Sequence, residues 1–306
     1  MIRNFLFHRV SPQRDLLWDP MDVALFDKCI AYISKKYTVM LLEDMVTRPD
    51  LKNLKNVATI LFDDGYKDNI EYAAPILAKY NCKASFYVVT DCIEKNIPTW
   101  THILEYYFQN TRISNINLIF DFLPLDLQVI ALSTEKDRLE YIRRLKPFLK
   151  TLSHEKRDLV LKRITETYKD VNLPRLMMDW QDLLKLYNSG HYIGSHTVSH
   201  YMLGSMTDEN EIRNELLRSA EMIQKHLGYF PRSISYPIGS YNDTTIRLSK
   251  EVGYSIGLAV KQQMYDPAKD SIFEIPRIEL YNENWFKTKM RITNLLETIK
   301  KTIGYK

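Results

Sequence analysis

Short apolar segments alternate with longer amphipathic ones along most of this chain, and that alternation restricts the fold more than any other feature of the sequence. The short segments are rich in β-branched and aromatic residues and are predicted to be strands: residues 2–7, 57–62, 84–89, 192–194 and 233–236. The longer segments have helical periodicity and cover residues 21–37, 69–80, 180–189, 208–227 and 244–252. Strands that alternate with helices predict an α/β fold with a mostly parallel sheet, whose functional loops follow the carboxyl ends of the strands.

A mainly helical region at about residues 95–175 interrupts this alternation. It contains helical patterns over residues 134–148 and 153–168 and few convincing strands. The sequence has no internal repeat and no low-complexity tract. We therefore predict one domain over residues 1–306, with an inserted helical subdomain.

The composition excludes several other classes of protein. Hydrophobic residues make up 45% of the 306 and charged residues 26%, with only 9 glycines, which is typical of a soluble globular chain. The net charge of +4 is too small for a dedicated nucleic-acid binder, so no nucleic-acid partner is expected. Cys29, Cys82 and Cys92 are odd in number and lack C-x-x-C spacing, so we expect reduced, buried thiols and neither a disulfide framework nor a thiolate zinc site.

The sequence predicts neither a membrane-spanning segment nor a cleaved signal peptide. Its most apolar stretch, residues 113–132, contains Asp121, Pro124 and Asp126, which argue against a membrane span. At the N-terminus, Arg9 comes before any apolar run of useful length. We therefore expect a cytoplasmic protein. Nothing in the sequence predicts an oligomeric state.

Two adjacent carboxylates follow the predicted strand at residues 57–62. Asp63 and Asp64 precede Gly65, which supplies a turn. Adjacent side chains at a strand end point in different directions, so one carboxylate can bind a metal while its neighbour faces a water bound to that metal. An Asp-Asp-Gly sequence is also ordinary turn chemistry, and taken alone it favours that simpler interpretation.

A second motif, His196-Thr-Val-Ser-His200, follows the predicted strand at residues 192–194. Histidines four residues apart lie on one face of a helical turn, where both imidazoles can reach one divalent ion. A chance H-x-x-x-H is unremarkable in a chain with 7 histidines. Together with Asp63 and Asp64, however, the motif completes a set of two histidines and one carboxylate, with a spare carboxylate as base.

The third motif, Tyr236-Pro-Ile-Gly239, follows another predicted strand. Its proline and glycine fix the backbone path, and an N–H held in this way can donate to a developing oxyanion. An ordinary tight turn is the alternative interpretation.

In this order the three motifs resemble those of the polysaccharide deacetylase family, also called carbohydrate esterase family 4 or NodB-like. Leu61-Phe-Asp-Asp-Gly65 is similar to its T-F-D-D-G motif, and the histidine motif fits H-[ST]-x-x-H. Residues 180–196 also resemble the family's usual approach to the metal histidines. The resemblance covers residues 1–90 and 178–280 and implies a distorted (β/α)₇-type barrel, a relative of the (β/α)₈ barrel.

The resemblance implies a role for each matching residue. Asp63 is the general base, and Asp64, His196 and His200 hold a divalent metal, with zinc as the first expectation and Co²⁺, Ni²⁺ or Mn²⁺ as alternatives. Asp63 takes a proton from the water that attacks the acetamide carbonyl, and the metal polarises that carbonyl. The backbone N–H of Ile238 corresponds to the family's second oxyanion donor.

Two departures from the family pattern lead to further candidates. The third motif commonly reads R-P-P-Y-G, so the arginine that orients the base is missing here; Arg277, in a segment that resembles a late strand, is the candidate replacement, and a surface arginine is the alternative. The family's acid histidine near the C-terminal end is also missing, because no histidine follows His226. His8 lies in Phe7-His-Arg-Val10, which resembles the M-Y-H-R-V opening of the permuted branch, typified by bacterial poly-N-acetylglucosamine deacetylases. It is the candidate acid, although a lone histidine after an apolar strand is usually structural.

Residues near the motifs are candidates for contact with a sugar. The candidates are Trp180, Tyr236, Pro237 and Tyr241. Aromatic rings line carbohydrate sites, but burial in the core is the default for any one of 20 tyrosines.

The leading hypothesis is a metal-dependent deacetylase that hydrolyses the N-acetyl group of a sugar in a polysaccharide or a glycan precursor. The same site chemistry allows an O-acetyl esterase or an amidase acting on a non-sugar amide. A third hypothesis is a non-catalytic carbohydrate-binding protein on a degenerate deacetylase scaffold. In the cytoplasm the substrate would be a nucleotide- or lipid-linked sugar.

Two segments have a net positive charge, and the rest of the chain is mildly acidic. Residues 135–170 hold 11 Lys and Arg against 7 Asp and Glu, and residues 284–306 hold 6 against 1. Solvated helix faces are the simpler explanation. The functional alternative is peripheral contact with the anionic inner face of a membrane or with a phosphate-bearing sugar carrier. In either case salt would weaken the binding.

Overall fold

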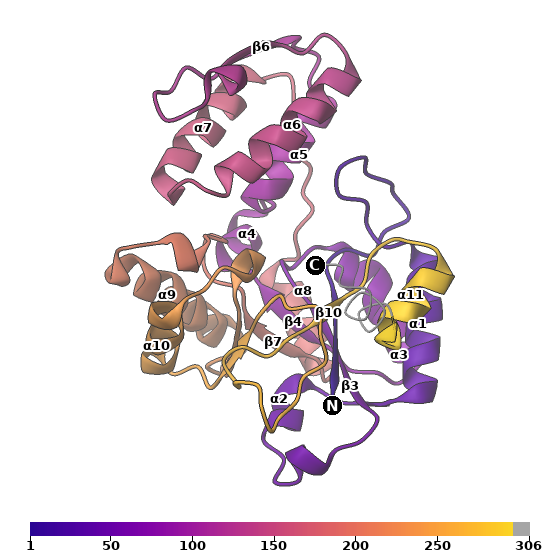
Figure 1. Ribbon diagram of the computed structural model, residues 1–306. Helices are drawn as coiled ribbons and strands as arrows, with labels where there is room; N and C mark the ends of the chain where they lie inside the picture. Colours follow the sequence, from indigo (N-terminus) through magenta and orange to yellow (C-terminus); the bar gives the residue numbers. More distant parts are fainter. Residues whose placement is uncertain (296–306) are drawn as a thin grey trace.

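A curled sheet of parallel strands forms the centre of the computed structural model, which describes residues 1–295 (Figure 1). Seven strands follow one another in the order β10-β1-β3-β4-β7-β8-β9, and β2 pairs with β3 beside this path. The strands are β1 (Arg3–Phe7), β2 (Thr38–Val39), β3 (Val57–Phe62), β4 (Ser85–Val88), β7 (Tyr192–Ser195), β8 (Ser233–Ser235), β9 (Ile256–Leu258) and β10 (Ile278–Glu279). The predicted α/β fold and distorted barrel are confirmed, and the five predicted strands correspond to β1, β3, β4, β7 and β8.

One segment brings the two edges of the sheet together. Ile275 forms a bridge with Leu258 of β9, and Ile278 pairs with Phe5 of β1. Arg277 lies between these two pairings and is only 1% exposed. The seam of the barrel therefore holds an arginine inside its wall.

Helices cover the outside of the sheet (Figure 1). Side-chain caps fix where several begin: the Asp22 carboxylate accepts two backbone N–H groups of α1, and Asp179 and Asp182 form a capping box at α8. The helices of the barrel are α1 (Val23–Lys36), α2 (Leu42–Val46), α3 (Ala74–Lys79), α4 (Thr90–Lys95), α8 (Trp180–Asn188), α9 (Glu209–Leu227), α10 (Asp243–Val252) and α11 (Trp285–Ile292). Its shorter helical turns are η1 (Leu51–Asn53), η2 (Asn69–Ala73), η4 (Leu203–Ser205) and η5 (Pro237–Gly239). The predicted helix at residues 69–80 begins as a π-helical turn, η2, and continues as α3.

A stack of phenylalanines holds the strand ends that lead into the loops. Phe62 of β3 lies between Phe7 of β1 and Phe86 of β4, with ring centroids 5.5 and 4.8 Å apart. Each ring is 1% exposed, and burial of such a side chain contributes about 1.5–3 kcal/mol. The residue directly after Phe62 is Asp63, so this core fixes the base of the loop that carries both carboxylates.

Three strands of the central sheet, β2, β9 and β10, have no predicted counterpart, and all three are very short. β2 and β10 have two residues each and β9 has three. So few residues show no alternation of polar and apolar side chains, and these strands exist because longer neighbours pair with them.

The insertion forms a lobe of its own over the rim of the barrel (Figure 1). It consists of α5 (Trp100–Asn110), the antiparallel strands β5 (Asn115–Asn117) and β6 (Val129–Ala131), the turn η3 (Leu125–Leu127), and helices α6 (Glu135–Leu149) and α7 (His154–Thr167). Its apolar side chains form a separate cluster around Leu104, Phe108 and Leu145. Helices α6 and α7 match the two predicted patterns, whereas α5 and the strand pair had no predicted range of their own.

The three cysteines are free and buried, as predicted. None of the helices within residues 1–295 is both long and apolar enough to cross a membrane. The predicted basic segment at residues 284–306 lies partly outside the described residues, which end at residue 295. In its described part, Lys287 and Arg291 of α11 both pair with Glu283.

Candidate metal centre and active site

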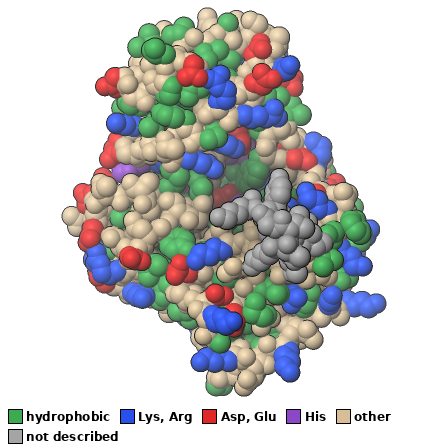
Figure 2. All heavy atoms as spheres, viewed as in Figure 1, with side chains coloured by type: hydrophobic (Ala, Val, Ile, Leu, Met, Phe, Trp, Pro, Cys, Tyr) green, Lys and Arg blue, Asp and Glu red, His purple; other side chains and the backbone are tan. Residues whose placement is uncertain are grey.

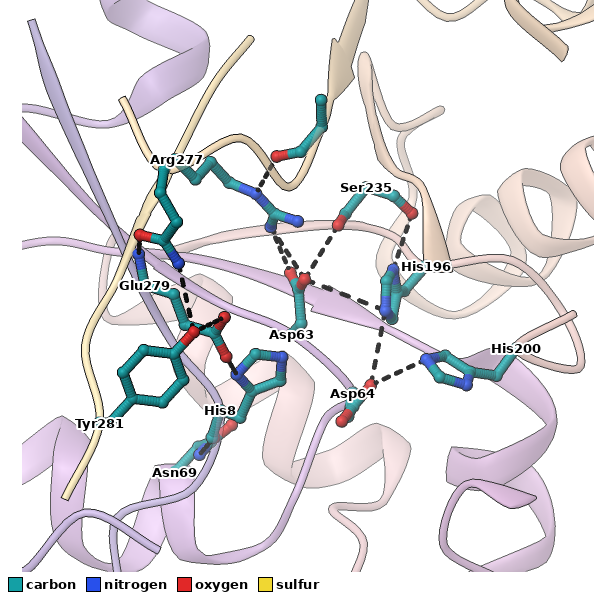
Figure 3. Close-up of polar contacts among 12 residues, drawn as sticks. His8, Asp63, Asp64, Asn69, His196, His200, Ser235, Arg277, Glu279 and Tyr281 are labelled. Atoms are coloured by element: carbon teal, nitrogen blue, oxygen red, sulfur yellow. Dashed lines mark hydrogen bonds and ion pairs between the residues drawn. The ribbon is translucent and has the colours of Figure 1, made fainter. Parts of the chain in front are cut away.

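The turn after β3 separates two adjacent carboxylates. Asp64 has a left-handed backbone (φ 75°), and Gly65 follows at φ 90°. A Cβ on Gly65 would lie 2.9 Å from Ile93 and 3.1 Å from Val88, so only glycine fits. The reversal sends the Asp63 side chain toward Arg277 and the Asp64 side chain toward two histidines (Figure 3).

Asp64, His196 and His200 meet at one point. The Oδ1 atom of Asp64 lies 3.4 Å from Nε2 of His196 and 3.4 Å from Nε2 of His200. The ligand atoms all lie within 4.8 Å of one another, and all three residues are buried. Oδ1 of Asp64 has no hydrogen-bond partner among residues 1–295. A buried, unpaired carboxylate oxygen beside two imidazole nitrogens is the donor set of an open divalent-metal site, so these residues fit the predicted metal.

The predicted helical spacing of the two histidines is wrong. Thr197 and His200 have left-handed φ values of 68° and 60°, which no α-helix accommodates. The buried carboxylate of Glu215, in α9, accepts the backbone N–H groups of Val198 and Ser199 at 3.1 and 2.9 Å. The hydroxyl of Thr197 accepts the N–H of His200. These contacts fold the segment into a tight loop that still brings the two ring centroids to 5.0 Å.

The strand beside the loop orients His196. Its Nδ1–H donates to the backbone carbonyl of Ser235 at 2.7 Å, because a carbonyl only accepts. That bond fixes the tautomer and leaves the Nε2 lone pair toward Asp64. Ser235 was not predicted as a site residue, and its backbone oxygen leaves no signal in the sequence.

Asp63 lies in a dense network of donors. Nη1 of Arg277 lies 2.9 and 2.8 Å from its two oxygens, and the Ser235 hydroxyl donates to Oδ2 at 3.0 Å. Arg277 is anchored in turn by its Nε–H, which donates to the carbonyl of Ala259. Burial alone would raise the pKa of Asp63, but the charges of Arg277, His196 and His8 outweigh it and hold the pKa below its usual range. Asp63 is thus an ionised carboxylate, and the predicted partnership with Arg277 is present in the structure.

His8 reaches the same site from the end of β1. Its Nδ1 lies 3.4 Å from Oε1 of Glu279, and its ring meets Trp18 edge-on at 5.4 Å. Glu279 also accepts the hydroxyl of Tyr281 at 2.6 Å. β10 pairs with β1, which places Glu279 next to His8 (Figure 3). Neither Glu279 nor Trp18 was predicted, because nothing in the sequence indicates that a two-residue strand pairs with β1.

Ile238 sits at the tip of η5 with φ 57°. The N–H groups of Gly239 and Ser240 close this turn on the carbonyls of Tyr236 and Pro237, so neither closing bond uses the N–H of Ile238. Ile238 lines the pocket together with the metal residues, and its side chain packs against the apolar cluster of the insertion. Its role as oxyanion donor stays a prediction.

Trp180, Tyr236, Pro237 and Tyr241, the predicted sugar-contact residues, do not line the pocket that contains the metal residues. The ring of Trp180 stacks on His226 at 4.1 Å. Tyr236 and Pro237 are buried, and Tyr236 stacks on Tyr241 at 4.9 Å. Contact of these residues with a substrate stays a prediction.

The pocket itself has a volume of about 240 Å³ and opens between the barrel and the insertion. In Figure 2 it corresponds to the hollow below the upper lobe. Its barrel wall contains the metal residues with Leu6, His8, Trp18, Asp63, Ile238, Val260 and Glu279. Its other wall comes from the insertion and contains Thr101, Glu105, Lys146 and Lys150.

The insertion also touches the histidine loop through Tyr201, the residue after His200. The hydroxyl of Tyr201 donates to Asp158 of α7 at 2.6 Å. Its ring stacks on His154 at 4.6 Å and lies 5.3 Å from the guanidinium of Arg157. The loop that carries a metal ligand is therefore held from both sides, by α9 and by α7.

Comparison with known proteins identifies relatives of the chain. Peptidoglycan-N-acetylglucosamine deacetylase of Bacillus cereus is 32% identical over 72 residues, which is 24% of this chain and 26% of that protein. The Bacillus subtilis protein YxkH is 20% identical over 212 residues, which is 69% of this chain and 47% of that protein. The matches therefore span about half or less of the curated relatives.

A solved structure shows the same fold. Streptococcus pyogenes deacetylase PplD, in complex with acetate, superposes with a TM-score of 0.61 at 19% identity, over 97% of each chain. The sequence model of the family named Polysaccharide deacetylase matches residues 50–257, more than half of the chain. With its aspartate pair and two histidines on this barrel, the chain belongs to the polysaccharide deacetylase family.

Proposed function

We propose that the protein is a metal-dependent deacetylase that hydrolyses the N-acetyl group of a sugar. The observation that carries this proposal is the division of labour between two adjacent carboxylates. Asp64 meets two imidazoles in a metal-type donor set, and Asp63 is held ionised by Arg277 beside it. A base next to a Lewis-acid site is the arrangement that amide hydrolysis by water requires.

The chain's own residues supply the remaining steps. Asp64, His196 and His200 would hold the divalent ion, which polarises the acetamide carbonyl when it is bound. Asp63 accepts a proton from the attacking water, whose oxygen forms a bond to the carbonyl carbon. The N–H of Ile238 donates to the oxyanion that develops. As the C–N bond breaks, the amine takes a proton, and acetate and the free amine leave.

We further propose that His8 delivers that proton, as in the branch of the family whose acid histidine lies on the first strand. Two observations support this assignment. His8 lines the same pocket as Asp63 and the metal residues, and Glu279 lies next to its Nδ1. A carboxylate beside one ring nitrogen orients an imidazole, and a general acid has to be held in position at the bond that breaks.

The experiment measures acetate release by zinc-loaded protein from N-acetylated and O-acetylated oligosaccharides assayed in parallel. We expect release from the N-acetylated substrate. In Asp63→Asn the rate should fall about 10²–10⁴-fold while the zinc content is unchanged, because the base is lost and the ligands remain. Asp121→Asn, at an exposed site of the insertion, is the matched control and should retain full activity.

Other outcomes would redirect the proposal. Release from O-acetyl esters alone would make the protein an esterase. Folded, zinc-loaded protein that releases no acetate from any acetylated sugar would favour a carbohydrate-binding role instead.

A further inference from the structure

The insertion contributes charged side chains to the pocket that holds the metal residues. Glu105 comes from α5, Lys146 from α6, and Lys150 directly follows α6. Figure 2 shows Lys and Arg side chains gathered at the hollow between the upper lobe and the barrel. This wall of the pocket lies outside the motifs that carry the family resemblance.

Most charges that line the pocket have a partner within the protein. Asp63 is paired with Arg277, and Glu105 is paired with Lys146. Glu279 accepts the Tyr281 hydroxyl and faces His8. The ammonium of Lys150, in contrast, makes no hydrogen bond or ion pair with any residue of the described range 1–295. The pocket therefore offers an unpaired cation opposite the metal residues.

The surroundings of Lys150 favour an anion beside it. Lys150 follows Lys146 by four residues, so the two ammonium groups lie on one face of the chain at the end of α6. Burial and the charge of Lys146 lower the pKa of Lys150, and Glu105 and Glu279 offset part of that effect. A bound oxyanion would relieve both the desolvation and the repulsion, and a lysine ammonium is a common point-charge partner of phosphate.

We propose that Lys150, supported by Lys146, forms an anion-binding subsite, and that the preferred substrate is an N-acetylated sugar bearing a phosphate or carboxylate group. This inference rests on the proposed deacetylase function and names the substrate class of the same site. The metal residues fix where the acetamide reacts, and the insertion selects sugars whose negative charge reaches Lys150.

The test compares three substrates by acetate release: N-acetylglucosamine 1-phosphate, N-acetylmuramic acid, and the neutral disaccharide of N-acetylglucosamine. We expect kcat/KM to be at least about tenfold higher for one or both charged sugars, with a preference that weakens as salt is raised. The charged sugar with the higher value identifies phosphate or carboxylate as the group recognised.

Variants of Lys150 decide whether the subsite is responsible. Lys150→Gln should lower the charged-to-neutral ratio of kcat/KM about tenfold, and Lys150→Arg should restore most of it because the charge returns. Lys136→Gln, at an exposed position of α6, is the matched control and should leave the ratio unchanged. A ratio near one in the native protein, or the same ratio in Lys150→Gln, would overturn the inference.

Binding measurements separate this inference from the proposed function. Calorimetry with N-acetylglucosamine 1-phosphate and N-acetylmuramic acid requires no turnover, and Lys150→Gln should weaken binding of the preferred sugar about tenfold. If that loss is seen but no substrate releases acetate, the subsite stands and the deacetylase proposal fails. If the neutral disaccharide is deacetylated and Lys150→Gln changes neither binding nor the ratio, the deacetylase stands and the subsite fails.

Discussion

The barrel rim and the insertion build opposite walls of one pocket, and they do so by different means. On the rim, short motifs at strand ends place buried groups with fixed partners: Asp63 with Arg277, and His196 with the Ser235 carbonyl. On the insertion, side chains from helices reach the pocket, and one of them, Lys150, has no ion-pair partner within residues 1–295. The difference teaches that the groups on the rim follow strand ends and have fixed partners, whereas the insertion contributes pocket residues that belong to no motif.

Removal of a metal ligand should produce the largest effect on activity, and the structural change should be confined to the barrel rim. We expect His200→Ala to bind less than one zinc per protein and to release acetate at least about 10³-fold more slowly. Without the ion, neither the attacking water nor the acetamide carbonyl would be activated. Zinc analysis and the acetate assay measure this loss. His200 belongs to none of the apolar clusters within residues 1–295, so near-ultraviolet circular dichroism should show a folded protein. Full zinc occupancy in the variant would remove His200 from the ligand set.

Loss of the Arg277 charge should destabilise the barrel strongly. Arg277→Gln leaves the Asp63 carboxylate buried without its ion pair, which typically costs about 3–5 kcal/mol. The double variant with Asp63→Asn should recover part of this loss, because no charge is then left unpaired. Urea unfolding of the single and double variants measures both values. Equal midpoints for native protein and Arg277→Gln would show that the pair carries no net stability.

A cavity in the insertion should destabilise the protein without disturbing the metal site. Leu145→Ala removes a fully buried side chain from the separate apolar cluster, and such changes cost about 2–5 kcal/mol. We expect earlier unfolding of the insertion in urea with zinc binding intact. Leu77→Ala in the barrel core is the matched control, and its cost should fall on the barrel transition. Coincident transitions in both variants would mean that barrel and insertion unfold as one unit.

The smallest expected effect is a pH dependence of barrel stability. Burial lowers the pKa of His191 to about 4 from its ordinary 6.5, and its Nδ1 accepts the N–H of Ala84 in the neutral form. The unfolded chain therefore binds more protons between these pKa values, so stability falls as the pH drops below 6.5. The loss amounts to about 2 kcal/mol at pH 5. His191→Gln should flatten the urea midpoint between pH 7 and pH 5, and an unchanged slope would contradict this.

The sequence could predict the residues whose spacing is fixed along the chain. The aspartate pair, the two histidines and the alternation of strands and helices all depend on local order. Arg277 and His8 could be predicted only because this chain lacks, at their usual places, two residues that the family pattern contains. Glu279 and Lys150 could not be predicted, since each reaches the site through a long-range contact with no fixed spacing. The helical interpretation of His196 and His200 failed because Glu215, from another element, bends the loop.

Left-handed backbone at the site has an evolutionary consequence. Asp64, Thr197, His200 and Ile238 are half of the eight non-glycine residues with positive φ within residues 1–295. Each such conformation costs about 1–2 kcal/mol, and a glycine would relieve it. Selection for thermal stability alone would therefore replace these four residues first. A laboratory evolution experiment that selects for heat resistance without an activity screen should accumulate glycine substitutions at these positions. The resulting protein should be more stable to heat and catalytically inactive.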